Sequence, residues 1–469
     1  ARRPEMETAR EKLHFLATTP LAEIAFEHIQ PNWRHTWINQ VEHNWEDLLP
    51  VGTKGTKLAK RPTDEQAIFK LYSLGVATNR DEWVYDFDQA HLQQKIKFFY
   101  QCYEQEKTRW NKSDQQIPIN DFVDRTIKWT SELERHLIKG SELKFDTAYI
   151  RPSMYRPFVK KKLYFDRIIV HRLYQQEVIF GLGAQYANVE ICMSGTSASK
   201  SYATLAVEYI PSLDFIEKTQ CFPRYTYDDH GARQDNITDW GVAQFTAHYG
   251  DALTAAAATL HAPLNAHIGA TVRDAIFYYV YGVLHNPAYR EKYELNLKRE
   301  FPRIPFYDDF TQWATWGQQL MDLHLHFENA TPYPLRRVDA PSPRGGKSRG
   351  GGTTPSPESG EGRGGGIMPK PKLKSDEDEG VIILDSRTTL VDVPPEAWQY
   401  VLGNRAAIDW VLYYYKERKP RDPTIREQFN TYRFADYKEA VIALLRRVVT
   451  VSVETVKIVD AMREADNHG

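Results

Sequence analysis

The stretch FYYVYGVLHNPAYREKYELNLKREFPRIPF, residues 277–306, indicates two helices followed by a stop. Apolar residues recur at helical spacing over 275–285, which predicts a buried helix. Asn286 and Pro287 interrupt it, because a residue that precedes proline is pushed out of the α region; Asn286 can then cap a second helix with Pro287 in its first turn. This helix, 288–300, is amphipathic, and two prolines end it. The stretch therefore predicts a packed helical hairpin without chemistry of its own.

Length and composition indicate a globular protein with room for two to four domains: 469 residues, 42% hydrophobic and 26% charged. The formal net charge of −2 excludes nucleic-acid binding through overall basicity, so any such binding must depend on local clusters. No run of 18 apolar residues occurs, which predicts no membrane span. Cys102, Cys192 and Cys221 lack metal-ligand spacing and predict a reducing, cytoplasmic location. The chain begins without methionine or a hydrophobic signal core, so we expect a fragment or a processed piece.

The segment 144–172 has a local charge of +6, because it holds eight Lys and Arg against two acids. Aromatic residues alternate with these cations, and prolines indicate loops between short strands. This mixture suits a DNA-phosphate surface, since cations release counterions while aromatic rings pack or wedge. The alternative is a solvated basic face. The candidate contact residues are Arg151, Tyr155, Arg156, Lys160, Lys161, Lys162, Arg167 and Arg172.

A second candidate lies in residues 68–85, where an apolar strand enters a glycine-containing turn and an aromatic strand leaves it. Thr78, Asn79 and Arg80 offer hydroxyl, amide and guanidinium groups that suit contacts with phosphates or base edges. The alternative is a self-capped turn, in which Asp81 accepts backbone N–H groups.

Taken together, the patterns predict an α+β fold of helices and short strands in several lobes, the last rich in helix. The chain is expected to divide into four segments: 1–60, 61–337, 338–379 and 380–469. The third is low in complexity and is expected to be a disordered linker. Helices are predicted at 91–107, 121–139, 251–261, 311–328, 406–416 and 437–461, and a strand pair at 381–391. His324 and His326 lie on different helical faces, so we expect no metal site there.

Several of these strings, in the same order, resemble the C-terminal specificity region of type ISP restriction–modification enzymes. They are 277–306, Gly-Val-x-Thr-Asn-Arg-Asp at 75–81, Tyr-Arg-Pro-Phe at 155–158, Leu-Tyr-Phe-Asp at 163–166 and Pro-Pro-Glu-Ala-Trp at 394–398. The family's Asn-Gly-Arg form is here Gly403-Asn404-Arg405, which leaves that turn in doubt. The resemblance implies that 1–60 is the end of a methyltransferase core and the segment that follows it, that 61–337 is a target-recognition domain, and that 380–469 is its C-terminal α/β lobe.

The resemblance also implies a module that recognises a double-stranded DNA sequence and positions it for adenine-N6 methylation and ATP-driven restriction. Upstream methyltransferase, helicase-like and nuclease domains of the same polypeptide would do that chemistry. We find no complete catalytic motif and therefore expect no cofactor in this chain; S-adenosylmethionine, ATP and magnesium would belong to the upstream domains. The lysines at 160–162 would hold phosphates, while Asn79, Arg80, Arg151 and Arg156 would reach the bases or the groove. Two alternatives stay open, a complete adenine methyltransferase with unrecognised motifs and a docking scaffold that does not bind DNA.

Overall fold

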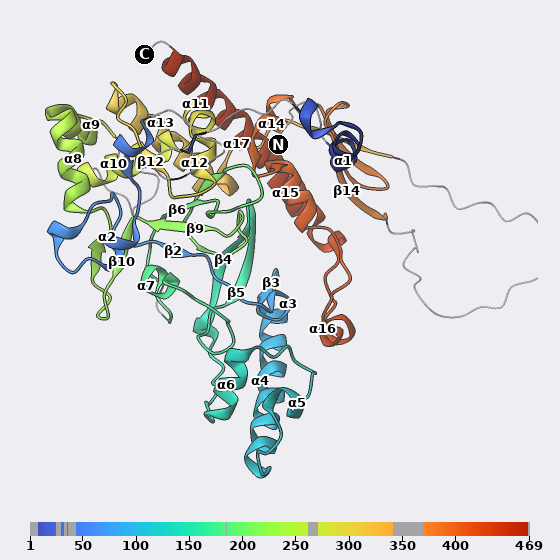
Figure 1. The fold of residues 1–469 in the computed structure, drawn as a ribbon. Helices are drawn as coiled ribbons and strands as arrows, with labels where there is room; N and C mark the ends of the chain where they lie inside the picture. Colours follow the sequence, from blue (N-terminus) through green and yellow to red (C-terminus); the bar gives the residue numbers. More distant parts are fainter. Residues whose placement is uncertain are drawn as a thin grey trace, which may run out of the picture. The chain divides into compact units, whose positions relative to one another are not determined.

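The computed structural model describes residues 8–24, 30–31, 35, 44–183, 185–260, 271–340 and 369–467 (Figure 1). The chain forms two compact units, 1–47 and 48–469. In the first unit, Thr8 caps α1 (Ala9–Thr18) in a capping box with Glu11, and the short 3-10 turns Leu21–Glu23 and Trp45–Asp47 follow. None of the described helices is long and apolar enough to cross a membrane.

The predicted hairpin is present in the second unit, with one correction. α10 (Val272–Val283) is buried from residue 274 onward, and the Asn286 side chain caps α11 (Pro287–Lys292) as expected. The single helix expected over 288–300 is instead α11 followed by α12 (Glu294–Leu297). Tyr293 separates them with a backbone at φ −109° and ψ 19°, outside the helical region, and its buried ring packs on Tyr289.

α10 packs very closely against α13 (Phe310–Leu325). The helix predicted at 311–328 is confirmed up to 325, and a separate 3-10 turn follows at Phe327–Asn329. The close contact requires two glycines. A Cβ on Gly317 would lie 1.8 Å from the carbonyl oxygen of Tyr278, and one on Gly282 would lie 2.7 Å from the carbonyl oxygen of Trp313. Backbone therefore meets backbone at this crossing, and no larger residue fits without separating the helices.

Two four-stranded sheets position the site. The first has the order β3-β5-β4-β8, in which β4 and β5 form an antiparallel hairpin and β8 runs parallel to β4. The second has the order β2-β9-β6-β7 and is antiparallel throughout. Their bounds are β2 (Ser73–Leu74), β3 (Tyr85–Asp86), β4 (Ile150–Arg156), β5 (Val159–Tyr164), β6 (Glu190–Met193), β7 (Thr204–Val207), β8 (Ile210–Pro211) and β9 (Gln220–Pro223).

Between β2 and β3 the chain differs from the expected aromatic strand. Residues 81–84 form the one-turn helix α3 (Asp81–Val84), because the N–H groups of Trp83 and Val84 both bond to the carbonyl of Arg80. The indole of Trp83 is fully buried and packs edge-on against Phe99 of α4 (Gln89–Lys112). Burial of that ring outweighs the weak strand preference of so short a segment.

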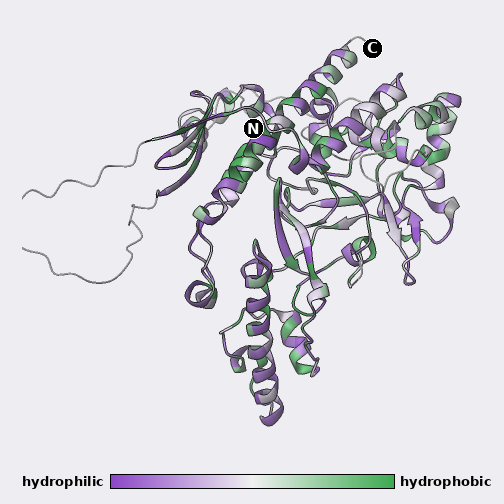
Figure 2. Cartoon of the chain, turned by 180° about the vertical axis from the view of Figure 1, so that it is seen from behind, coloured by the Kyte–Doolittle hydropathy of each residue, from purple (hydrophilic) through white to green (hydrophobic). Residues whose placement is uncertain are grey.

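α4 contains the helix predicted at 91–107 and is mostly hydrophilic along its length (Figure 2). The helix expected over 121–139 is wrong in its first half. Only α5 (Ile119–Phe122) and α6 (Ser131–Ile138) are helical, because Asp124 accepts the backbone N–H of Thr126 and Thr130 caps the second helix. Gly140 ends α6 at φ +69°, the left-handed geometry that suits glycine.

The C-terminal part adds a third four-stranded sheet, of order β13-β16-β15-β14. Its strands are β13 (Arg336–Asp339), β14 (Pro371–Asp376), β15 (Val381–Asp385) and β16 (Thr388–Val391). Both ends of the segment expected to be a linker, 338–379, are therefore folded as strands, while 341–368 lies outside the described residues. The other elements here are α14 (Glu396–Gln399), β17 (Val401–Leu402), β18 (Arg405–Ala406), α15 (Ala407–Tyr414), α16 (Pro423–Gln428) and α17 (Phe434–Asn467).

One apolar core joins this C-terminal part to the preceding sheets. It includes Phe158, Leu205 and Phe327 together with Trp410 and Leu445, all of them buried. This core spans the boundary predicted near 380, and the two compact units of the chain are 1–47 and 48–469. The α+β class is confirmed.

The remaining elements complete the second unit. They are β1 (Leu49–Pro50), α2 (Lys54–Leu58), α7 (Gln176–Phe180), β10 (Tyr225–Tyr227), β11 (Arg233–Asp235), α8 (Asp239–Tyr249), α9 (Asp251–Thr259) and β12 (Arg303–Ile304), with 3-10 turns at Pro62–Asp64, Thr147–Tyr149 and Phe327–Asn329.

Candidate functional site

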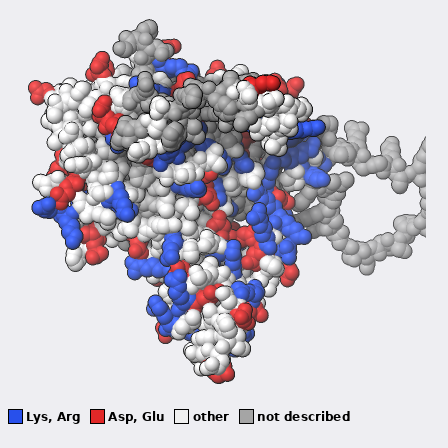
Figure 3. All heavy atoms as spheres, in the orientation of Figure 1, with Lys and Arg blue, Asp and Glu red and all other residues white. Residues whose placement is uncertain are grey.

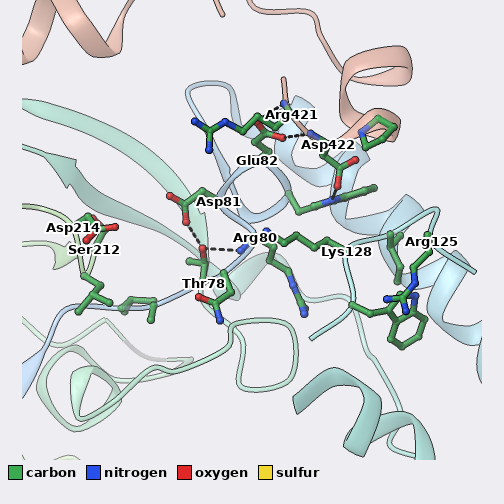
Figure 4. Close-up of a pocket in the computed structure, with 18 of the residues that line it drawn as sticks. Thr78, Arg80, Asp81, Glu82, Arg125, Lys128, Ser212, Asp214, Arg421 and Asp422 are labelled. Atoms are coloured by element: carbon green, nitrogen blue, oxygen red, sulfur yellow. Dashed lines mark hydrogen bonds between the residues drawn. The ribbon is translucent and has the colours of Figure 1, made fainter. Parts of the chain in front are cut away.

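The turn between β2 and β3 forms one wall of an open cavity of about 640 Å³. Its other walls come from the segment before α6, the turn after β8 and the loop that begins α16 (Figure 4). The lining residues are Val76, Ala77, Thr78, Asn79, Arg80, Asp81, Glu82, Trp83, Arg125, Ile127, Lys128, Trp129, Arg156, Ser212, Leu213, Asp214, Arg421, Asp422 and Pro423. We call this the 78–82 cleft.

Side-chain bonds within the turn fix its shape. The Thr78 hydroxyl donates to Asp81 and accepts the backbone N–H of Arg80, so the turn is closed internally (Figure 4). Asn79 lies at φ +54°, a left-handed geometry that asparagine tolerates better than most residues. Thr78 and Arg80 are buried, whereas Asn79 is exposed. Of the three residues predicted here, Asn79 alone presents its side chain to solvent at the cleft.

The side chain of Arg80 points into the protein interior and is buried there. Its guanidinium donates to the carbonyl of Ile169 at 2.8 Å and to the hydroxyl of Thr130 at 2.7 Å. Burial lowers the pKa of Arg80 to about 9. Arg80 therefore joins the turn to the start of α6 and to the segment after β5.

A buried network supports the neighbouring wall. The Tyr155 hydroxyl donates to Asp81 at 3.0 Å, and burial, together with the Asp81 charge, raises the pKa of Tyr155. Arg156 donates to the Tyr414 hydroxyl and to Ser212 Oγ, both at 3.0 Å, and its guanidinium lies 4.2 Å from the centre of the Tyr155 ring. These contacts hold the first sheet against α15.

The loop at α16 closes another side of the cleft. The Glu82 carboxylate accepts the backbone N–H groups of Arg421 and Asp422 at 2.9 and 2.8 Å (Figure 4). The indole N–H of Trp83 donates to Asp422 at 2.7 Å. Two segments more than 330 residues apart in the chain are thereby fixed against each other.

Three cations that the sequence did not single out, Arg125, Lys128 and Arg421, line the cleft and are exposed. Among the described residues, none of the three forms an ion pair. Sequence reasoning missed them because they come from two segments, 125–128 and 416–421, which only the fold brings to the same turn. Two signals were usable for Arg421: the basic run at 416–421, and the tight turn at Asp422-Pro423, where a cap and a proline fix the loop.

The other predicted arginines are divided between interior and surface. Arg151 is buried and donates to the carbonyls of Phe180, Gly181 and Leu182 at 2.9–3.2 Å, so it caps the C-terminus of α7. Arg167 and Arg172 are at least half exposed and pair with Glu177 and Glu132, both at 2.7 Å. The +6 segment therefore presents fewer free charges than its composition indicates.

The three successive lysines do not share one face, because side chains alternate along β5. Lys160 pairs with Glu328 at 2.7 Å. Lys161, on the other side of the sheet, lies between the rings of Phe87 and Tyr155, and burial together with nearby Lys95 lowers its pKa to about 8. Lys162 is half-buried and forms no ion pair with another described residue.

Lys161 lines a second cavity of about 520 Å³, together with Lys416 and Arg418. Glu82 lines both this cavity and the 78–82 cleft, so the two lie side by side. Figure 3 shows basic side chains in a band from the sheet that contains β14 to the segment between α15 and α16, with acidic side chains next to it over α3 and β3. The region around the cleft is therefore charged in both signs, and its basic side comes from residues near 416–421.

The chain was compared with known families and structures. A family model described as the Type ISP C-terminal specificity domain matches residues 67–444. No curated protein matches the chain. A structure described as "cryoEM structure DrdV-DNA complex" is 43% identical, with a TM-score of 0.81, and the match covers 97% of this chain and 42% of that one.

Two further solved structures are similar. A nuclease-deletion mutant of the Type ISP restriction-modification enzyme LlaGI, in complex with a DNA substrate mimic, is 26% identical with a TM-score of 0.74, covering 97% of this chain and 38% of that one. The ATP-dependent Type ISP enzyme LlaBIII, bound to DNA, is 23% identical with a TM-score of 0.68, covering 93% and 25%, and supports the fold alone. The chain thus spans less than half the length of each relative. Because the family model covers most of the chain, the protein belongs to the Type ISP C-terminal specificity domain family.

Proposed function

We propose that this chain recognises a double-stranded DNA sequence as the specificity part of a restriction–modification enzyme. The observation that carries the proposal is the likeness, at 43% identity, to a chain whose structure is described as a complex with DNA. The 78–82 cleft supports it, because it combines exposed cations with an exposed amide on a rigid turn.

Different groups of the cleft would have different roles. Arg125, Lys128 and Arg421 would contact phosphates, which position the duplex without reading its sequence. Asn79 would read a base edge, since a carboxamide can form two hydrogen bonds with the major-groove edge of adenine. Thr78, Arg80 and Arg156 would hold the turn and its wall rather than touch DNA, as their internal bonds indicate.

Methylation and restriction would belong to a longer polypeptide. The nuclease, helicase-like and methyltransferase domains expected from the family, with S-adenosylmethionine, ATP and magnesium, remain part of this proposal, as does a cytoplasmic location. This chain would deliver the recognised site to them in one orientation, so that the target adenine can be turned out of the duplex.

Selection from a pool of random duplexes tests the proposal. The chain is expected to enrich one short sequence and to bind it far more tightly than the starting pool. Asn79→Gly keeps the left-handed turn but removes the amide, so the fold should persist while discrimination at one base pair weakens by about 1–3 kcal/mol. Failure of the wild-type chain to enrich any sequence would leave the docking scaffold as the better account.

A methyl-transfer assay separates the module from a complete enzyme. The purified chain is expected to transfer no methyl group from radiolabelled S-adenosylmethionine to the selected duplex. Clear transfer by the chain alone would contradict the division of labour proposed above.

A further inference from the structure

Two cysteines separated by 28 residues in the sequence face each other in the second sheet. Cys192 of β6 is the direct cross-strand partner of Cys221 of β9, and their sulfur atoms are 3.7 Å apart. Glu190 lies two residues before Cys192 on the same strand and therefore on the same face of the sheet. All three side chains are fully buried, and one donor atom from each lies within 4.8 Å of the others.

The polar atoms of this cluster are not all satisfied. Oε2 of Glu190 and Oε1 of Gln176 are buried and have no hydrogen-bond partner among the residues that the structure describes. Gln176, at the start of α7, contacts the cluster: its amide nitrogen donates to Oε1 of Glu190 at 3.3 Å. A buried oxygen without a partner is costly, and two such oxygens beside two thiols need a physical explanation.

We propose that Cys192, Cys221 and Glu190 bind a structural zinc ion, with the carboxamide oxygen of Gln176 as the fourth ligand. The sulfur separation fits this geometry. Two Zn–S bonds of about 2.3 Å that meet at a tetrahedral angle place their sulfur atoms about 3.8 Å apart. A disulfide would need the sulfurs to approach to about 2.05 Å, which requires the two strands or side chains to move.

The donor set selects zinc among the common metals. Thiolates are soft ligands that magnesium and calcium do not take, while two sulfurs with two oxygens suit a four-coordinate site. Four protein ligands leave no open position, so the ion would be structural. Binding requires both thiols and the carboxyl group to lose their protons, and burial of these groups makes uptake strongly dependent on pH.

The site would join β6, β9 and α7 near the end of β2, the strand that leads into the turn of the 78–82 cleft. β6 and β9 are adjacent strands of one sheet, and Gln176 also donates to the carbonyl of Leu74 at 3.2 Å, at the end of β2, which leads into the turn. α7 is held at its other end by Arg151. The ion would therefore fix the sheet to α7 and anchor the strand from which the turn begins.

Elemental analysis of the purified chain tests the proposal. Wild type and the control Cys102→Ser are expected to contain about one zinc ion per chain, whereas Cys192→Val and Cys221→Val should contain at least about tenfold less. Cys102 is the right control because it is a half-exposed cysteine on α4, outside the cluster. Wild type stripped with a chelator should regain its zinc, and its melting temperature should rise when zinc is restored.

Cobalt gives a readout that does not depend on the variants folding. Stripped wild type with added Co²⁺ is expected to show thiolate-to-cobalt charge-transfer absorption and the visible bands of a tetrahedral site. Glu190→Gln should change these bands, since it replaces one charged ligand. Wild type that is purified without zinc and shows no such absorption in excess cobalt would overturn the proposal. Mass spectrometry that finds Cys192 and Cys221 joined by a disulfide in the native chain would also overturn it.

Discussion

Replacing Arg125, Lys128 and Arg421 together by alanine should flatten the salt dependence of DNA binding. Each phosphate contact contributes about 0.9 to the slope of log affinity against log salt concentration, so three lost contacts should reduce the slope by about 2.7. Between 50 and 200 mM salt, the wild type should then lose about 40-fold more affinity than the variant. The number three comes from the structure, because three exposed cations line the cleft and pair with no acid in the described part of the chain.

Fluorescence anisotropy with one duplex, over a series of salt concentrations, measures the slope. The matched control replaces Lys112, Lys139 and Lys372, which are exposed and lie outside the cleft, and it changes the net charge by the same amount. Both variants should unfold within about 0.5 kcal/mol of wild type, since all six changes are on the surface. Equal slopes for the two triple variants would show that the cleft does not hold phosphates.

Three further predictions concern the fold. Gly317→Ala should lower the unfolding free energy by about 1–3 kcal/mol or more in urea titration, because its Cβ would overlap the Tyr278 carbonyl; unchanged stability would contradict the close crossing. Arg151→Met should cost about 1–3 kcal/mol for each carbonyl left without a partner at the end of α7, and thermal unfolding equal to wild type would argue against that cap. Burial lowers the pKa of His324 to about 3; the unfolded chain therefore binds the proton first, and stability should fall by about 1.4 kcal/mol per pH unit from about pH 6.5 toward 3. Calorimetry of His324→Phe should show a shallower acid slope, and an unchanged slope would contradict a neutral buried imidazole.

Local signals were enough to predict much of the helical structure. Asn286 and Pro287 are residue types suited to a cap and a first helical turn, and Gly140 can adopt the left-handed backbone that ends a helix. Predictions failed in two places, one decided by a tertiary contact and the other by local hydrogen bonds. Residues 81–84 are helical because the buried ring of Trp83 packs against Phe99. Residues 123–130 are not helical because the side chains of Asp124 and Thr130 accept hydrogen bonds from nearby backbone N–H groups.

The candidate site was harder to predict, because the residue types in a segment do not show whether each side chain points into the protein or toward solvent. Arg80, Arg151 and Arg156 have the residue type that DNA contact requires, yet their guanidinium groups bond to carbonyls and hydroxyls inside the protein. Those acceptors belong to segments that only the fold brings near. Of the three residues predicted at the turn, Asn79 is the one whose side chain is exposed, as is usual for a polar residue in a tight turn.

The cysteines show the same limitation. Spacing along the chain excluded a metal site formed by neighbouring residues, but strand pairing places Cys192 opposite Cys221. A motif search considers only spacing along the sequence. The pairing of β6 with β9, which brings the two cysteines together, depends on the fold.

The apolar core shared by Phe158, Leu205, Trp410 and Leu445 has a practical consequence for making hybrid proteins. Two relatives cannot exchange halves at 341–368 without mixing the two sides of one packed interior, and mismatched side chains there leave gaps or clashes. New target preferences should transfer more readily by grafting the turn at 78–82 and the loop at 421–423 as a pair. The compact unit 48–469 can instead be exchanged as a whole, which keeps this interior intact.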